Sequence, residues 1–521
     1  MADPVVQIGD VNRVAAHDAS NEASDKDDLI ARIRSRRSKE IVIGLAGAVG
    51  CNLADVIQEL NRQFSIYNYR IQTVKVSEII KAYYAENPLP ANHFGKDLSQ
   101  LKSAERYRTL QDLGNSIRKD LNTFALAAQA IRIISTEREL QIKVNDREEP
   151  PRTVYIVDQL KHPDEVNLFR SVYKNVFYLI GVLSPEDARL AYLQQEEIDA
   201  VSAQELIERD RNENLNHGQK LEKTIQHADY FIRSTLNSAQ TLAKPCQRFV
   251  GLVHGNNGLT PTKDEVGMYA ANSAALKSAC LSRQVGAAIS DERGNILSTG
   301  WNDVPKAGGG LYTADDDTAD QRCVNMGGKC YNDFHKNKLV EKIIEVISPN
   351  IKGGTEAARK LSEKILKDTP VGSLIEYSRA VHAEMEAILN MARLQSGSTD
   401  GATLYSTTYP CHNCARHIIA AGIKRVVYIE PYEKSLATTL HFDAISRDKP
   451  DGVKIVFENF EGVSPKKYLT FFSSNSDRKD SFGRATKNIN KDAAIVSTEL
   501  LDSYLDVESK VVARAAQDFQ G

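Results

Sequence analysis

The chain has 521 residues, of which 41% are hydrophobic and 26% are charged. This length exceeds one ordinary domain and the composition is typical of a soluble globular protein, so two or three domains are expected, each with its own core. Proteins that bind the phosphate backbone of long nucleic acids usually have an excess of basic residues, whereas this chain has a formal net charge of −3. The charge therefore argues against binding of long nucleic acids as the function.

No targeting or membrane signal is evident in the sequence. Residues 1–37 are polar, with neither a basic start nor an apolar segment, and predict a disordered tail rather than a secretory signal. No run of about 18 apolar residues occurs, so no membrane-spanning helix is expected. Seven cysteines in a long chain fit a reducing compartment better than a disulfide framework. These features predict a cytoplasmic protein.

Residues 38–240 alternate between strand and helix patterns. Strand patterns occupy residues 39–47, 69–76, 152–160 and 175–183, and helical patterns occupy residues 53–64 and 164–173. The first strand ends in glycines, which indicates a tight turn before the first helix. Strands that alternate with helices predict an α/β domain with a parallel sheet.

A second predicted domain covers residues 247–472 and follows a short bridge over residues 238–247. Thr262 and Glu265 form a capping box, which predicts the start of a helix. The remaining features are strand patterns over 285–290, 295–301, 402–408, 425–431 and 453–460, an insertion over 306–377 with two helical patterns, and a C-terminal extension over 473–521 that ends in a helix.

His382-Ala-Glu384 and Pro410-Cys411-x-x-Cys414 carry the chemistry of this second domain. One imidazole and two thiolates supply three zinc ligands and leave the fourth tetrahedral position to water, which is the arrangement of a catalytic site. The C-x-x-C spacing at a helix start lets both sulfurs reach one metal, and the helix dipole favours thiolate there.

Glu384 is the expected proton carrier. Zinc lowers the pKa of its bound water to about 7, but deamination also requires proton transfer to the ring and to the departing amine. Glu384 lies two residues after a ligand at the same helix start and can act as general acid and base. The combined pattern H-x-E…P-C-x-x-C is the signature of zinc deaminases that act on nucleobases.

Three segments resemble the deoxycytidylate deaminases: LSRQVGAAISDERGNILSTGWNDVP, HAEMEAIL and GATLYSTTYPCHNCARHIIAAGIKRVVYIEPY. The resemblance implies a cytidine deaminase-like α/β/α domain with a mixed sheet. It also implies that Asn302 holds the sugar hydroxyl and nearby backbone, that Arg283 meets the phosphate and that Tyr432 walls the pocket. Trp301 stands where the family has its aromatic residue, and Asp303 replaces the family's glycine.

Four further residues suggest a second, structural zinc, as some relatives have: Cys280, Cys323, Cys330 and His335. The spacing of Cys323 and Cys330 is not that of a standard ligand pair. Scattered buried thiols are the alternative to a zinc site.

The segment IGLAGAVGCNLADVI resembles the phosphate loop of small-molecule kinases. The resemblance implies an N-terminal P-loop kinase-like domain with these nucleotide-binding candidates: Gly44, Gly47, Gly50, Cys51, Asn52 and Asp158. Leu53 stands at the lysine position, and Ala54 replaces the hydroxyl that binds Mg²⁺. We therefore expect a regulatory nucleotide, with or without Mg²⁺, rather than phosphotransfer, and a scaffold without any ligand is the alternative.

The order of a P-loop kinase-like domain before a deoxycytidylate deaminase domain resembles the bacterial anti-phage deoxycytidine nucleotide deaminases. The resemblance implies depletion of dCTP and dCMP during infection, a homo-oligomer and an inhibitory factor. Two other functions stay open: a deaminase that edits tRNA or single-stranded DNA, which favours a basic groove with stacking aromatics, and a nucleotide sensor without catalysis. The single tryptophan and the near-neutral charge favour free nucleotides as substrates.

Overall fold

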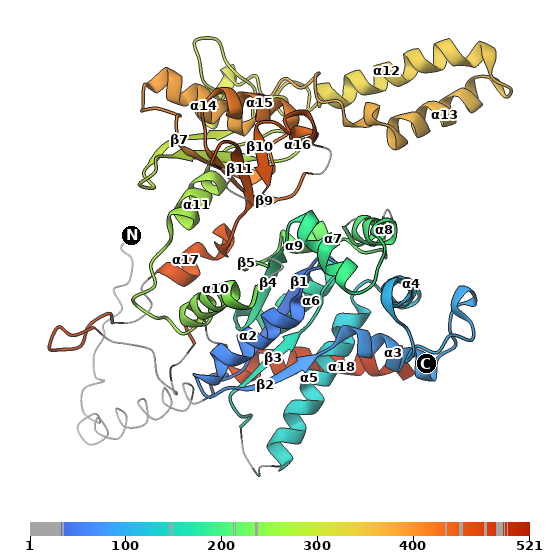
Figure 1. The fold of residues 1–521 in the computed structure, drawn as a ribbon, viewed down its shortest axis with the longest axis vertical. Coiled ribbons are helices and arrows are strands. Elements are labelled where there is room, and N and C mark those ends of the chain that lie inside the picture. The colour runs from blue at the N-terminus through green and yellow to red at the C-terminus, as the bar shows by residue number, and fades with distance from the viewer. Residues whose placement is uncertain are drawn as a thin grey trace, which may run out of the picture.

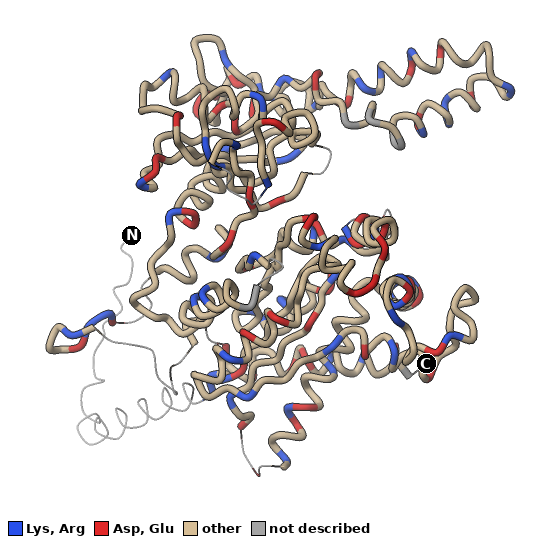
Figure 2. The backbone as a smooth tube through the Cα atoms, viewed as in Figure 1, with Lys and Arg blue, Asp and Glu red and all other residues tan. Residues whose placement is uncertain are grey.

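The computed structural model describes residues 33, 36–144, 146, 149–211, 213, 215–234, 238–432, 435–447, 452–473, 477–485, 493, 495–497 and 499–520 (Figure 1). The predicted tail over residues 1–37 lies outside these residues, apart from Ile33, Arg36 and Arg37. Within the described part, no helix is both long and apolar enough to cross a membrane. Basic and acidic residues are interspersed along the chain (Figure 2).

The first sheet has six strands in the order β12-β5-β4-β1-β3-β2, with β1 at its centre. Strands β2 to β5 are parallel to β1, and only β12 runs antiparallel. The strands are β1 (Ile41–Gly47), β2 (Arg70–Val74), β3 (Thr153–Val157), β4 (Phe177–Leu183), β5 (Tyr230–Arg233) and β12 (Gly462–Val463). All residues of β1, β3 and β4 are buried, as the continuous apolar runs of a covered parallel sheet require. The predicted parallel α/β arrangement is therefore present.

Helices join and cover this sheet. They are α2 (Leu53–Ser65), α3 (Val76–Glu86), α4 (Ser103–Asp120), α5 (Ala125–Val144), α6 (Pro163–Tyr173), α7 (Glu186–Gln195), α8 (Ala200–Arg211), α9 (Leu221–Ile225) and α10 (Ser238–Val253). Asn52 caps α2 by accepting a hydrogen bond from the backbone N–H of Asp55 at 3.3 Å. Helices α7, α8 and α9 lie at the end of the first sheet that faces the second (Figure 1).

The bridge predicted over residues 238–247 is wrong, because this segment belongs to helix α10. Pro245 inside the helix costs about 3 kcal/mol by removing a hydrogen bond and crowding the preceding turn. Leu242, Cys246 and Phe249 are fully buried, and α10 packs against α2. Burial of this apolar face outweighs the local preference of proline.

The C-terminal end of the chain returns to the first sheet. Strand β12 pairs with β5, and α18 (Leu501–Gln520) packs against α5 and α6. Arg138 on α5 is buried and forms ion pairs with Glu40, at 2.9 Å, and with Glu508 on α18, at 2.5 Å. The first sheet is therefore completed by residues from both ends of the sequence.

The second sheet has the order β10-β11-β9-β8-β6-β7. It is mixed: β8, β9, β10 and β11 are parallel, and β6 and β7 are antiparallel additions. The strands are β6 (Gly286–Ser290), β7 (Ile296–Trp301), β8 (Thr403–Thr408), β9 (Arg425–Glu430), β10 (Ile445–Arg447) and β11 (Ile455–Asn459). Helices α11 (Lys263–Ala275), α14 (Ala383–Leu394), α15 (His412–Ala420), α16 (Ala437–Leu440) and α17 (Tyr468–Phe472) accompany it.

Both faces of the second sheet are covered. Helix α11 packs so closely on one face that a Cβ added to Gly286 would lie 2.0 Å from the backbone oxygen of Ala271. Helix α14 covers the other face, where a Cβ added to Gly300 would lie 2.3 Å from the backbone oxygen of Ala383. Only glycine allows such backbone contact between strand and helix. The arrangement is the expected α/β/α order, and it fixes the start of α14 against β7.

Residues 306–377, expected as an insertion, contain the two predicted helices, α12 (Tyr331–Ile347) and α13 (Gly354–Asp368). They form a hairpin that projects away from the second sheet (Figure 1). Val340, Ile344 and Ala358 form a small apolar cluster between the two helices. Short 3-10 helices cover Ala91–His93, Lys174–Val176, Ala314–Ala319, Ser348–Asn350, Pro370–Ser373 and Pro465–Lys467.

Candidate active site

Helix α14 positions His382 and Glu384. His382 is its N-cap residue and Glu384 lies in its first turn. Two hydrogen bonds tie α14 to strand β7: Ser298 Oγ donates to the carbonyl of Ala387, and Asn390 Nδ2 donates to the carbonyl of Thr299, each at 2.8 Å. The start of the helix is thereby held at a fixed depth over the sheet.

Helix α15 positions the two cysteines. Cys411 is its N-cap residue, and its Sγ accepts a hydrogen bond from the backbone N–H of Cys414 at 3.4 Å. The backbone N–H of Tyr409 donates to the carbonyl of Glu430 at 2.7 Å, which fixes the chain between β8 and α15. Both sulfurs therefore lie at a helix start, where N–H groups without helical partners stabilise negative charge.

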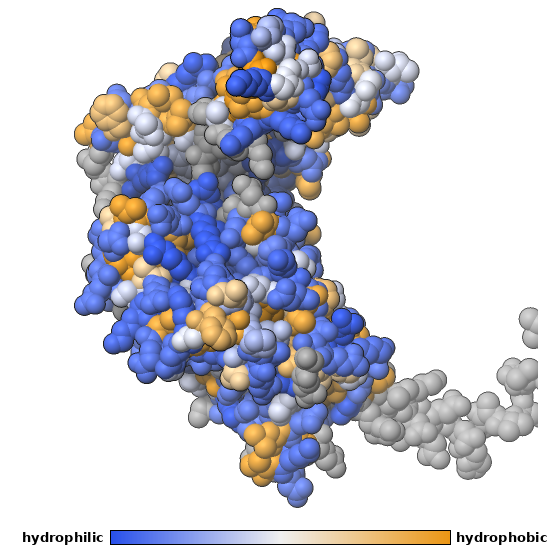
Figure 3. All heavy atoms as spheres, turned by 90° about the vertical axis from the view of Figure 1, so that its right-hand side faces the viewer, coloured by the Kyte–Doolittle hydropathy of each residue, from blue (hydrophilic) through white to orange (hydrophobic). Residues whose placement is uncertain are grey.

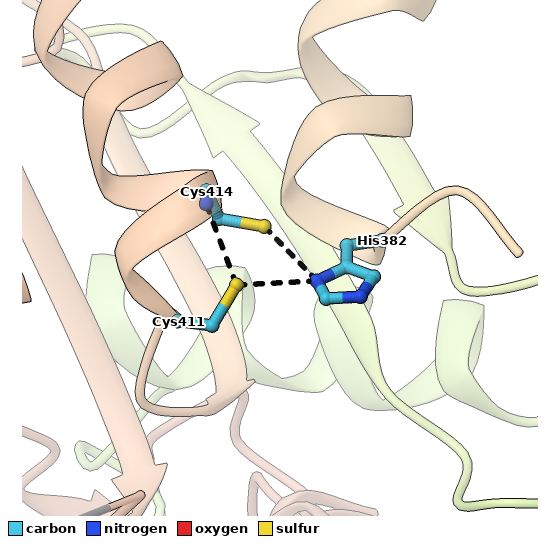
Figure 4. Close-up of side chains that lie close together, drawn as sticks. All are labelled: His382, Cys411 and Cys414. Carbon is cyan, nitrogen blue, oxygen red and sulfur yellow. Dashed lines mark hydrogen bonds between the residues drawn. The ribbon is translucent and has the colours of Figure 1, made fainter. Parts of the chain in front are cut away.

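The three predicted zinc ligands converge. Nδ1 of His382 lies 3.3 Å from the Sγ atoms of both Cys411 and Cys414 (Figure 4). Ligands at 2.0–2.3 Å from one tetrahedral zinc ion are separated by about 3.5 Å, so the donor set fits this metal in chemistry and in spacing. His, Cys, Asp and Glu are the residue types that could serve as ligands, and among those described, only His382, Cys411 and Cys414 place three ligand atoms within 4.8 Å of one another. A set of three leaves the fourth position open.

The surroundings of this group favour a thiolate at Cys411 and raise the pKa of the neighbouring carboxyl group of Glu384. Hydrogen bonds from the Cys414 thiol and from His382 lower the pKa of Cys411 to about 4, although burial opposes them. Burial raises the pKa of Glu384, which is 4% exposed, although His382 opposes this shift. Sγ of Cys414 lies 3.5 Å from Oε2 of Glu384. The carboxyl group thus lies directly beside the metal ligands and away from bulk water.

A cavity of about 170 Å³ opens over these residues. The predicted site residues that line it are Arg283, Asn302, His382, Glu384, Cys411 and Tyr432. Cys414 lies beneath this wall, fully buried. Trp301 does not line the cavity, and its ring lies under Nζ of Lys277, 4.8 Å from the ring centroid.

Asn302 organises the turn that carries Arg283. Its Oδ1 accepts a hydrogen bond from the backbone N–H of Val285 at 2.7 Å, and its Nδ2 donates to the carbonyl of Arg283 at 2.8 Å. Arg283 in turn forms an ion pair with Glu430 at 3.1 Å, with 42% of its side chain exposed. The amide therefore holds the backbone at Arg283 and Val285, and Arg283 lines the cavity.

The insertion contributes one wall of the cavity, which sequence reasoning missed. Tyr331, Asn332 and Arg379 line it together with the catalytic residues. No spacing pattern marks the first two, although Arg379 precedes His382 by only three residues. Tyr409 also lines the cavity, and its place directly before the Pro-Cys motif was the available signal.

Cys280, Cys323 and Cys330 lie around the same cavity. They do not form a group of three ligand atoms within 4.8 Å of one another, as far as the described residues show. His335, the fourth candidate ligand, packs against Phe334 and Tyr377. The structure gives no support to a second zinc site.

In the glycine loop between β1 and α2, one backbone donor is occupied by a side chain of the protein itself. The backbone N–H of Val49 donates to Oδ2 of Asp210 at 2.7 Å, and this carboxylate is fully buried. Nζ of Lys161 lies 2.6 Å from Oδ1 of Asp210 and donates to the carbonyl of Gly47 at 2.9 Å. Gly50 has φ +85° and would place a Cβ 2.7 Å from the carbonyl oxygen of Arg189. The carboxylate of Asp210, on α8, thus accepts the hydrogen bond of one backbone N–H of the loop, that of Val49.

The other loop candidates have structural partners. Sγ of Cys51 donates to the carbonyl of Val182 at 3.7 Å, and a Cβ at Gly44 would lie 2.6 Å from Cδ1 of Leu160. Asp158 follows β3, as expected, and accepts a hydrogen bond from the backbone N–H of Val76 at 2.9 Å. Burial raises the pKa of Asp158.

Comparison with known proteins gives consistent relatives for the second sheet and its helices. The profile of the cytidine and deoxycytidylate deaminase zinc-binding region matches residues 261–430. Deoxycytidylate deaminase of Enterobacteria phage T2 is 34% identical over 160 residues, which cover 30% of this chain and 75% of that protein. The enzyme of Enterobacteria phage T4 is 33% identical over 159 residues, covering 30% of this chain and 73% of that protein.

A solved structure is also similar: dCMP deaminase from the cyanophage S-TIM5 in complex with dCMP and dUMP. It shares 21% sequence identity, and the match covers 39% of this chain and 99% of that chain with a TM-score of 0.23.

Proposed function

Because the chain belongs to the deoxycytidylate deaminase family and is a hydrolase of C–N bonds, we propose that its substrates are free deoxycytidine nucleotides, dCMP and dCTP. The products are the corresponding deoxyuridine nucleotides and ammonia. One observation carries the proposal. Buried Glu384 lies beside three convergent zinc ligands in the wall of a single cavity. A structural zinc site has no use for a proton carrier at that place.

His382, Cys411 and Cys414 would hold the zinc ion. When bound, zinc supplies a water molecule whose pKa is lowered to about 7. Glu384 would carry two protons in turn: it takes one from the attacking water and delivers it to the ring nitrogen, then takes the second from the hydroxyl now on the ring carbon and delivers it to the amine, which leaves as ammonia while the carbonyl forms. Burial raises the pKa of Glu384, which favours this exchange of protons because a raised pKa makes the carboxylate a better proton acceptor. Burial keeps the proton from exchanging with bulk water.

The rim of the cavity would hold the nucleotide. Asn302 fixes the turn at Arg283–Val285, and Arg283 would form charge-assisted hydrogen bonds with the phosphate. Tyr432 supplies one wall, and burial raises the pKa of its hydroxyl, which keeps it neutral. Binding of phosphate to Arg283 competes with the ion pair to Glu430, whose own pKa is raised by burial.

The test is a direct comparison of substrates. Purified protein is assayed for ammonia release from dCMP, dCTP and a cytosine-containing oligonucleotide, with Glu384→Gln as the matched variant. We expect activity on the nucleotides, none on the oligonucleotide, and loss of activity in Glu384→Gln with zinc retained. Activity on the oligonucleotide alone would instead support an editing deaminase, and unchanged activity of Glu384→Gln would refute the proposed proton carrier.

Residues 38–240 are proposed to form a P-loop kinase-like domain that binds a regulatory nucleotide at the glycine loop. The support is the central position of β1 between β3 and β4, the glycine turn at its carboxyl end and Asp158 after β3. Ala54 offers no hydroxyl for Mg²⁺, so phosphotransfer is not proposed. Calorimetry with ATP on the full chain tests this role, and binding that persists unchanged in Gly50→Val would place the nucleotide elsewhere.

The biological role proposed from the order of the two domains is depletion of the dCTP pool during phage infection. A homo-oligomer and an inhibitory factor belong to the same proposal. Cells that express the wild-type chain should lose dCTP and restrict phage, and cells that express Glu384→Gln should do neither. Equal restriction by both proteins would separate the defence role from deamination.

A further inference from the structure

A second cavity lies beside the catalytic cavity, at the seam between the two sheets. We call it the seam cavity, and its lining residues are Pro163, Arg211, Glu222, Lys223, Gln226, His227 and Arg283. Arg283 belongs to the second sheet's side and lines both this cavity and the catalytic one. Arg211 on α8 and Lys223 on α9 come from the first sheet's side. Arg283 is therefore the point at which the two cavities meet.

The seam cavity has more positive than negative charge. Glu222 is the only carboxylate among the residues that line it, against Arg211, Lys223 and Arg283. Burial raises the pKa of Glu222, although Arg211, Arg283 and Lys223 all act on it in the opposite direction. Burial also lowers the pKa of Arg211, which shows that this guanidinium is partly withdrawn from water. A cluster of cations in a concave surface raises the local concentration of anions.

The surroundings of the seam cavity continue this pattern. A neighbouring cavity of about 300 Å³ shares Arg211 and Glu222 with the seam cavity, and Tyr409 and Tyr432 with the catalytic cavity. Its lining includes Arg189, whose Nε is buried and has no hydrogen-bond partner among the described residues. Figure 3 shows that the surface is hollowed between the two parts of the molecule and that hydrophilic residues line much of the hollow.

We propose that this seam binds the β- and γ-phosphates of a deoxycytidine triphosphate substrate, with Arg283 at the α-phosphate and Lys223 and Arg211 beyond it. This assignment rests on the proposed deaminase function and adds the residues that hold the outer phosphates of its triphosphate substrate. A nucleotide whose base faces Glu384 and whose sugar lies near Asn302 directs its phosphates outward past Arg283. The first sheet's side then completes the substrate site, which the deaminase part alone would leave open.

Arg211 and Lys223 would contribute to phosphate binding in different ways. The planar guanidinium of Arg211 can form paired hydrogen bonds with phosphate oxygens, and the exposed side chain of Lys223 offers an ammonium group to the cavity. The carboxylate of Glu222 repels an anion in this cavity and therefore weakens triphosphate binding. It would also make the binding affinity depend more strongly on the charge of the nucleotide. Removal of a cation and removal of this carboxylate should therefore shift dCTP binding in opposite directions.

The test compares kcat/KM for dCTP and for dCMP in four proteins: wild type, Lys223→Met, Glu222→Gln and Lys143→Met. Lys143, on α5, is 77% exposed and lies outside both cavities, so it is the matched control. We expect the ratio of dCTP to dCMP kcat/KM to fall about tenfold in Lys223→Met, which corresponds to one charge-assisted hydrogen bond. We expect the KM for dCTP to fall in Glu222→Gln and the ratio to stay at the wild-type value in Lys143→Met.

The outcomes separate the inference from the function on which it rests. A wild-type ratio in Lys223→Met, with dCMP still deaminated, overturns the seam site and leaves the deaminase proposal intact. Absence of deamination of either nucleotide by the wild type overturns both. A separate effector site at the seam would appear as a change of dCMP turnover by ATP that is lost in Lys223→Met, and this outcome also overturns the substrate-tail assignment.

Discussion

Gly300 controls the depth at which α14 rests on the second sheet, and Gly300→Ala probes this contact. The added Cβ would lie 2.3 Å from both the backbone oxygen of Ala383 and the backbone nitrogen of Ala387. Ordinary contact begins at 3.4 Å, so the helix start must move away from β7 by about 1 Å. Overpacking of this kind costs about 1–3 kcal/mol of folding free energy.

This displacement carries His382 and Glu384 away from the two cysteines, which are attached to another helix. A shift of about 1 Å at a reacting group lowers the rate about 100-fold. The assay is kcat for dCMP together with zinc content and the melting temperature. We expect a folded protein with a lower melting temperature, less zinc and about 1% of the activity.

Gly267→Ala is the matched control, because its Cβ would lie 2.2 Å from the ring of Tyr405 on the opposite face of the sheet. It should lower the melting temperature but leave the activity of the folded protein near that of the wild type. Full activity and full zinc content in folded Gly300→Ala would refute the view that this contact sets the site geometry.

Three predictions concern stability. Lys161→Met leaves the buried carboxylate of Asp210 without its cation and should cost about 3–5 kcal/mol in urea unfolding; an unchanged midpoint would contradict the pairing. Burial raises the pKa of Asp264, but the hydrogen bonds and charge of Arg425 outweigh it and lower this pKa overall. The ion pair between Asp264 and Arg425 therefore stabilises the fold above about pH 4, and this stabilisation is lost as the pH falls through the pKa of Asp264 in the folded protein. The difference between wild type and Asp264→Asn, about 1–2 kcal/mol at pH 7, should therefore vanish in acid, and a difference that grows in acid would refute it. Deletion of residues 501–520 should expose the first sheet's core to limited proteolysis, and an unchanged cleavage pattern would contradict its packing role.

The zinc group was predictable because its determinants are local. His382 and the Cys411–Cys414 pair each stand at a helix start, and the spacing along each helix brings their donor atoms to one side. Only the meeting of the two helices is a tertiary fact, and the small residues of the strands and helices, such as Gly300, allow it. The strands of the first sheet were predictable for a similar reason, since continuous apolar runs leave few alternatives.

Features that depend on contacts between distant segments were not predictable. Residues 238–247 were predicted as a bridge, but burial of Leu242, Cys246 and Phe249 in the core makes this segment part of helix α10 despite Pro245. Strand β12 pairs with β5 through only two residues, and two residues are too few to show the alternating pattern that predicts a strand. Arg283 and Lys223 line one cavity although they are far apart in the sequence and belong to no common motif.

Metal analysis of the purified chain tests the central claim most directly. Zinc content is measured in the wild type and in His382→Ala, and dCMP deamination is followed as zinc is removed by a chelator and then restored. We expect zinc bound through the three ligands, loss of both zinc and activity in His382→Ala, and activity that falls and recovers with the metal. Full deamination by a chain shown to be free of metal would contradict it.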